Sequence, residues 1–137
     1  MALTGHTLYA GDGAGPLLRL TAPISLWGGV AAKTGIITAR GHPQCGKSLA
    51  RTVAWLPGLI GSSSSASIML ELINNGVAPA AVLLARSDAI LVTGCIVAGE
   101  MGLRAPPVVL CALGAAPGGN ARVLAGPEGA TIWLGGD

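Results

Sequence analysis

The chain has 137 residues, enough for one domain with a core of its own, and 51% of them are apolar. Only 10% of the residues are charged, where soluble domains usually have about a quarter, and the eight basic side chains nearly balance the six acidic ones. There is no basic stripe interleaved with aromatic residues and no run of about 20 apolar residues, so the composition excludes a nucleic-acid-binding surface and a membrane-spanning helix.

So few charges indicate a subunit whose surface is covered in part by a partner. Phenylalanine is absent, so the core must be built from Leu, Ile, Val and Ala, and 22 glycines and nine prolines predict many turns and short elements. No basic segment followed by an apolar one opens the sequence, as it does in a secretory signal, and we therefore expect a cytoplasmic chain.

The first half of the chain is expected to be rich in short strands, because short apolar runs alternate there with glycine and proline. The expected strands are Thr7–Ala10 and Leu17–Leu20 around a turn at 11–13, then Ile36–Ala39 and Thr52–Leu56, with a loop at 23–29. Trp27 lies in that loop, where we expect it to anchor packing.

The first helix is predicted just after a cluster of serines at 62–65. Apolar residues recur at helical spacing on one side of the run 66–75, and Gly76 follows where a glycine commonly ends a helix. A helix N-terminus offers unpaired N–H groups, to which serine hydroxyls add donors, and this combination suits a carboxylate or a phosphate. On the residues alone, however, a simple serine N-cap is the favoured interpretation.

The second half of the chain alternates predicted strands and a helix. Asp88 is placed to N-cap a helix that runs through Met101 and ends at Gly102. The expected strands are Ala81–Ala85, Val108–Cys111, Val123–Leu124 and Thr131–Leu134, with a turn at 117–120. A β-rich front followed by alternating helix and strand predicts a layered α/β fold with more sheet than helix.

The segment 41–48, GHPQCGKS, matches the pattern of a phosphate-binding P-loop in full. A P-loop opens a helix, however, and the residues after Ser48 are few, include strand formers and stop at Pro57. No apolar strand ends in an aspartate that could hold magnesium. We therefore regard nucleotide binding through Lys47 as the weakest of the functional hypotheses.

Three cysteines, Cys45, Cys95 and Cys111, are widely spaced and form no pattern typical of a disulfide framework or a zinc site. Cys95 and Cys111 lie in apolar runs and are expected to be buried as small hydrophobic side chains. Cys45 has no partners that would make it an iron ligand.

Three uncommon segments occur together and in order. They are PISLWGGV at 23–30, the glycine-bounded stretch 35–46 with its His42-Pro43 pair, and 61–79, which ends in NNGVAP. In this combination the chain resembles the small subunit, or swivelling domain, of aconitase X, from about Leu3 to about Leu110.

This resemblance implies an α/β fold of three β/β/α layers, a swivelling domain spanning 1–137, that docks on a larger subunit to form a heterodimer. Members of the family are hydro-lyases whose iron–sulfur cluster is held by cysteines of the large part, so no cofactor is expected on this chain. They dehydrate a phosphorylated mevalonate in archaea or cis-3-hydroxy-L-proline in bacterial relatives. The composition lacks a thermophile's charge networks and favours the hydroxyproline reaction.

The resemblance also implies a set of site residues. Ser62 matches the family's catalytic base, Ser63 and Ser64 would bind the anionic group of the substrate, and Gly61 and His42 complete the expected substrate-binding residues. For His42, the alternative is a loop histidine that is bonded by the backbone.

One departure from the family bears on activity. The family usually has an arginine before the glycine of the serine segment, and Ile60 stands there in this chain. Arg40 and Arg51 are the candidates to replace its charge. The resemblance makes a lyase subunit the first hypothesis. The missing arginine makes a binding module that retains the fold without the chemistry the second.

Overall fold

A computed structural model of the chain describes residues 1–60 and 64–136. Its elements are, in chain order, β1 (Ala2–Tyr9), β2 (Gly11–Arg19), α1 (Leu26–Gly29), β3 (Val53–Leu56), α2 (Ser65–Asn74), β4 (Ala81–Leu84), α3 (Ala89–Glu100), β5 (Val108–Leu110), β6 (Asn120–Gly126) and β7 (Gly129–Gly136).

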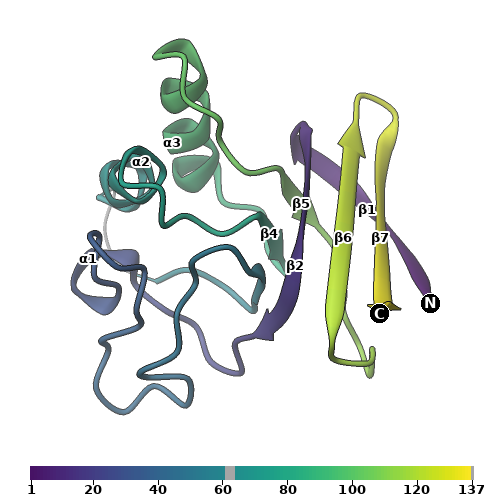
Figure 1. Ribbon diagram of the computed structural model, residues 1–137, viewed down its shortest axis with the longest axis horizontal. Coiled ribbons are helices and arrows are strands. Elements are labelled where there is room, and N and C mark those ends of the chain that lie inside the picture. The colour runs from purple at the N-terminus through teal and green to yellow at the C-terminus, as the bar shows by residue number, and fades with distance from the viewer. Residues whose placement is uncertain (61–63, 137) are drawn as a thin grey trace.

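The two long N-terminal strands each change partner half-way and so join two sheets (Figure 1). The first half of β1 pairs with β7 and its second half with β5, whereas β2 pairs first with β6 and then with β3. The strands close in the order β1-β5-β4-β3-β2-β6-β7. Strands β2, β3, β4 and β5 run parallel to one another.

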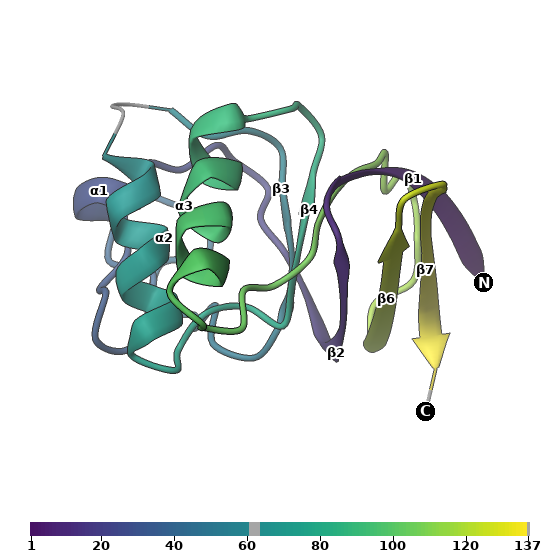
Figure 2. The same ribbon diagram turned by 90° about the horizontal axis from the view of Figure 1, so that it is seen from above.

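The chain forms three layers, with α2 and α3 on one face of the parallel strands and the antiparallel sheet on the other (Figure 2). Side chains of β3 and β4 alternate between two apolar cores. Ala54 and Val82 face the helices, whereas Val53 and Leu83 face the antiparallel sheet. Burial on both faces explains why these strands are continuously apolar. The three-layer α/β fold expected from the sequence is confirmed.

Both predicted helices form where their end signals place them. The Asp88 carboxylate accepts the Leu91 N–H at 2.9 Å and caps α3. At the end of α2, Gly76 has φ 72°, its N–H reaches the Ile73 carbonyl, and the next N–H reaches back to Leu72. This pair of bonds satisfies carbonyls that the helix leaves open. Within the described ranges, no helix is long and apolar enough to cross a membrane.

The predicted turn at 11–13 is wrong, because Gly13 lies within β2 and the chain reverses at Ala10. A Cβ atom on Gly13 would come within 1.9 Å of the Ala80 carbonyl oxygen, and one on Gly15 within 2.2 Å of the Arg51 carbonyl oxygen. These glycines therefore allow a close approach of backbones that the local pattern does not reveal.

Two further local expectations need correction. The stretch 36–39 makes isolated bridges, with Ile36 opposite Ser48 and Ile37 opposite Val30, and is not a regular strand. The loop expected at 23–29 contains the single turn α1, in which Trp27 and Gly28 depart from helical backbone angles.

Candidate functional site

The carboxyl ends of β2, β3 and β4 meet at one edge of the parallel sheet, where the connecting segments 20–25, 57–64 and 85–88 begin. In α/β proteins, the carboxyl ends of parallel strands are where ligands commonly bind. The segment after β3 leads directly into α2, so the predicted serine segment connects this edge to a helix N-terminus.

Backbone hydrogen bonds hold two of these connections together. The Ile24 N–H donates to the Gly58 carbonyl at 3.3 Å, and the Ile60 N–H donates to the Ile24 carbonyl at 3.0 Å. Position 60 is therefore fixed beside the segment that follows β2, although its side chain is 58% exposed.

Ser62, the predicted catalytic base, falls outside the described residues, as do Gly61 and Ser63. Its described neighbours on either side are Ile60, at the sheet edge, and Ser64, which directly precedes α2. Ser65 begins the helix and is buried. The helix thus starts at the serine cluster, as the pattern predicts, and the role of Ser62 stays a prediction.

His42 is bonded through both ring nitrogens to the main chain. Its Nδ1 accepts the Gln44 N–H at 3.0 Å, so its Nε2 carries the hydrogen and donates to the Ala22 carbonyl at 2.9 Å. These bonds tie the loop at 42–44 to the segment after β2. They correspond to the backbone-bonded alternative, and substrate binding by His42 remains a prediction.

An open hollow of about 470 Å³ lies at this edge between the turn α1 and the loop that contains His42. Trp27, Arg40, His42 and Ile60 are among the residues that line it. Trp27 is 64% exposed, so the expectation that it anchors packing within this chain is wrong. The sequence contains one sign of this exposure, because Trp27 is followed by Gly28 in a predicted loop. The sequence pattern does not show which residues would surround its side chain.

A second hollow, of about 330 Å³, lies on the other side of Ile60. Arg86 and Asp88 both line it, so the charges of its described lining residues balance. Pro23 and Ile60 line both hollows. The first hollow has Arg40 and no described acidic side chain in its lining, whereas the second has both Arg86 and Asp88.

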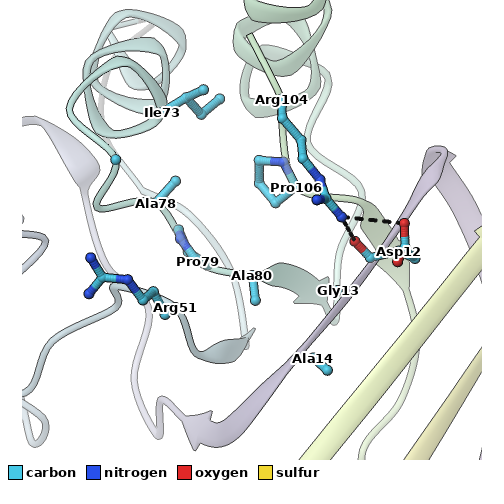
Figure 3. A pocket seen from close by; sticks show the side chains of 11 residues that line it. Asp12, Gly13, Ala14, Arg51, Ile73, Ala78, Pro79, Ala80, Arg104 and Pro106 are labelled. Atoms are coloured by element: carbon cyan, nitrogen blue, oxygen red, sulfur yellow. Dashed lines mark hydrogen bonds and ion pairs between the residues drawn. The ribbon is translucent and has the colours of Figure 1, made fainter.

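A third hollow, of about 410 Å³, lies at the opposite edge of the parallel strands (Figure 3). Arg51 precedes β3 on one wall, and on the other wall Arg104 lies 3.5 Å from the Asp12 carboxylate. Because β3 runs between Arg51 and Ile60, Arg51 is at the wrong end of the strand to replace a charge at position 60.

The segment that matches a P-loop does not open a helix. Residues 41–48 form a series of turns, Ser48 bridges to Ile36, and the described chain continues into β3. The backbone context that the P-loop chemistry requires is therefore missing here.

The three cysteines lie in different parts of the molecule. Cys45 is exposed in the turns that follow His42, Cys95 faces the core beneath the helices, and Cys111 faces the core between the sheets. No group of three or more His, Cys, Asp or Glu side chains within the described ranges is arranged to hold a metal ion. These residues do not fit an iron–sulfur cluster, which needs several thiolates together.

Residues 2–114 match the family model of the aconitase X swivel domain. The chain belongs to the aconitase X swivel domain family. An aconitase X structure from Thermococcus kodakaraensis, in its holo form, superimposes with a TM-score of 0.82 at 24% identity over 96% of each chain. That likeness shows the same fold.

Two named relatives of this swivel domain are dehydratases. Cis-3-hydroxy-L-proline dehydratase of Pseudomonas aeruginosa is 42% identical over 103 residues, which are 75% of this chain and 18% of that protein. The phosphomevalonate dehydratase small subunit of Methanocella arvoryzae is 36% identical over 99 residues, 72% of this chain and 75% of that subunit. The chain thus spans under a fifth of the first relative and most of the second.

Proposed function

We propose that this chain is the small subunit of an aconitase X-type hydro-lyase and that it acts as a heterodimer with a large subunit. The observation that carries the proposal is the family match over residues 2–114, which includes the entire serine segment. The small-subunit relative supports a two-chain enzyme. We further propose that residues 1–137 make up one swivelling domain.

In the proposed reaction, a hydroxy acid loses a proton from one carbon and hydroxide from the neighbouring carbon. The electron pair of the broken C–H bond forms the new C=C bond, and the proton and the hydroxide leave together as one water molecule. Ser62 takes the proton. A neutral serine hydroxyl is a poor base, so it must act as an alkoxide that surrounding N–H groups stabilise. A segment between a glycine and the N-terminus of α2 suits this task, because helix N-termini favour negative charge. The cysteines of this chain do not fit a cluster, so any iron–sulfur cluster belongs to the large subunit.

The substrate that we propose is cis-3-hydroxy-L-proline. Support comes from the 42% identity to the bacterial dehydratase that is named for it, compared with 36% for the phosphomevalonate dehydratase small subunit. Phosphomevalonate remains the alternative, because both kinds of relative match similar lengths of this chain.

The test is co-expression with an aconitase X large subunit, followed by assays of both substrates. We expect a stable complex that converts cis-3-hydroxy-L-proline, and no conversion by either chain alone. Conversion of phosphomevalonate would assign the alternative substrate. A complex that forms but converts neither compound would indicate a binding module that kept the fold and lost the chemistry.

A further inference from the structure

The hollow beside Trp27 and Ile60 carries a positive charge that no acidic side chain among its described lining residues balances. Arg40 lines it, and the guanidinium of Arg40 has no hydrogen-bond or ion-pair partner in the part of the chain that the structure describes. None of the described lining residues is acidic. The other titratable side chain, His42, is engaged by backbone atoms through both nitrogens. Among the described lining residues, Arg40 is therefore the one charged side chain, and no described group pairs with it.

Two other arginines provide the comparison. Arg86 lines the hollow on the far side of Ile60 together with Asp88, so the lining of that hollow has an acidic as well as a basic side chain. Arg51 lies before β3, at the opposite edge of the sheet (Figure 3). Arg40 is thus the arginine that combines a place beside Ile60 with an unopposed charge.

The walls of the hollow fit a small anion that has a carbon skeleton. Trp27 and Ile60 expose 64% and 58% of their surface and provide apolar area in the hollow that Arg40 also lines. A guanidinium binds carboxylate and phosphate groups through two parallel N–H bonds, which fixes the orientation of the bound group.

We propose that Arg40 binds the anionic group of the substrate and supplies the charge that Ile60 does not. This inference rests on the proposed function and names the residue that recognises the substrate. The group bound is a carboxylate or a phosphate, and Trp27 and Ile60 contact the carbon skeleton beside it.

The test uses the assembled complex with Ser62→Ala, so that substrate is not consumed during the measurement. Calorimetry with cis-3-hydroxy-L-proline and with phosphomevalonate gives the dissociation constants and shows which anion is bound. We expect Arg40→Ala to raise the dissociation constant about 10- to 100-fold, the effect of one charge-assisted hydrogen bond, and Arg40→Lys to raise it less. Arg51→Ala and Arg86→Ala are the matched controls and should leave it within about threefold of the starting value.

A second experiment tests whether an arginine at position 60 can replace Arg40 in binding the anionic group. Ile60→Arg in the Arg40→Ala background should recover most of the lost affinity. With Ser62 intact, Arg40→Ala should raise KM while kcat changes little, because uniform binding is lost.

An unchanged dissociation constant in Arg40→Ala would overturn the assignment, as would an equal loss in Arg51→Ala, which would indicate only a general attraction of anions. A complex that binds neither anion would overturn it as well. If the complex binds one of them but the form with Ser62 intact turns over neither, the proposed function fails, and the calorimetry still decides the role of Arg40.

Discussion

At the scale of single residues, the three thiols differ sharply in their surroundings. Burial raises the pKa of Cys95 to about 12 and that of Cys111 to about 11, whereas Cys45 is exposed. The reactive form of cysteine is the thiolate, so a buried thiol with a raised pKa is inert while the fold is intact.

We therefore predict that one thiol per chain reacts rapidly with a thiol-specific reagent at pH 8, and that it is Cys45. The other two should react only after the chain unfolds. Cys45→Ala should remove the rapid phase completely. A rapid phase that persists in this variant would contradict the burial of Cys95 and Cys111.

The same pKa shifts predict how stability depends on pH. In the unfolded chain the thiols lose their protons near pH 9.0, but in the folded chain Cys111 does so near 11 and Cys95 near 12. Above pH 9 the unfolded state binds fewer protons, so the free energy of unfolding falls by up to about 1.4 kcal/mol per pH unit for each thiol. Urea unfolding at pH 8, 9 and 10 measures this slope, and Cys95→Ala should reduce it.

The candidate site could be read from the sequence only in part. The position of the serine cluster at a helix N-terminus follows from local signals, the glycine before it and the apolar periodicity after it. The exposure of Trp27 and the separation of Arg40 from Arg51 could not be predicted from local signals. Both depend on which loops lie together at each end of β3, and that is set by the tertiary fold.

At the scale of elements, α2 and α3 pack through a glycine. A Cβ atom on Gly94 would lie 2.7 Å from the Ala66 carbonyl oxygen and 3.1 Å from the Met69 Cβ atom. The glycine therefore lets the two helices approach more closely than an alanine would allow.

Gly94→Ala should destabilise the protein by about 1–2 kcal/mol, because overpacking against the backbone of α2 outweighs the gain in helix propensity. Thr93→Ala, at the exposed neighbouring position, is the control and should change stability by less than about 0.5 kcal/mol. Urea unfolding of the two variants compares them directly. A Gly94→Ala variant as stable as the parent chain would show that the helices are free to separate.

Elements with local end signals were predictable, and those defined by distant partners were not. The bounds of α2 and α3 follow from Asp88, Gly76 and Gly102, each of which acts on its own helix. The full lengths of β1 and β2 require pairing with β6 and β7, more than a hundred residues away along the chain. Short apolar runs therefore predicted only the halves of β1 and β2 that pair with β5 and β3.

At the scale of the whole molecule, α3 has large apolar side chains on its outer side as well as on the side that faces the core. Ile90 and Val97 are exposed there, as is Met101 directly after the helix, although Leu91 and Cys95 of the helix are buried. A helix that is apolar all round is usually covered on both sides. This surface agrees with the low charge of the sequence, from which we predicted a surface covered in part by a partner.

Expressed alone, the chain should self-associate as its concentration rises, because this apolar surface is open to solvent. The double variant Val97→Lys, Met101→Lys should be monomeric by light scattering, whereas Leu124→Lys on β6 should behave like the parent chain. A parent chain that remains a monodisperse monomer at high concentration would contradict this account of α3.

The kcat of the assembled complex with Ser62→Ala tests most directly the proposal that Ser62 performs chemistry in a two-chain dehydratase. Ser67→Ala, on the exposed side of α2, is the matched control. Loss of a general base should lower kcat by about 10²–10⁴-fold while assembly is unchanged, and the control should keep the parent kcat. A Ser62→Ala complex that turns over substrate at the parent rate would mean that the serine segment only caps α2.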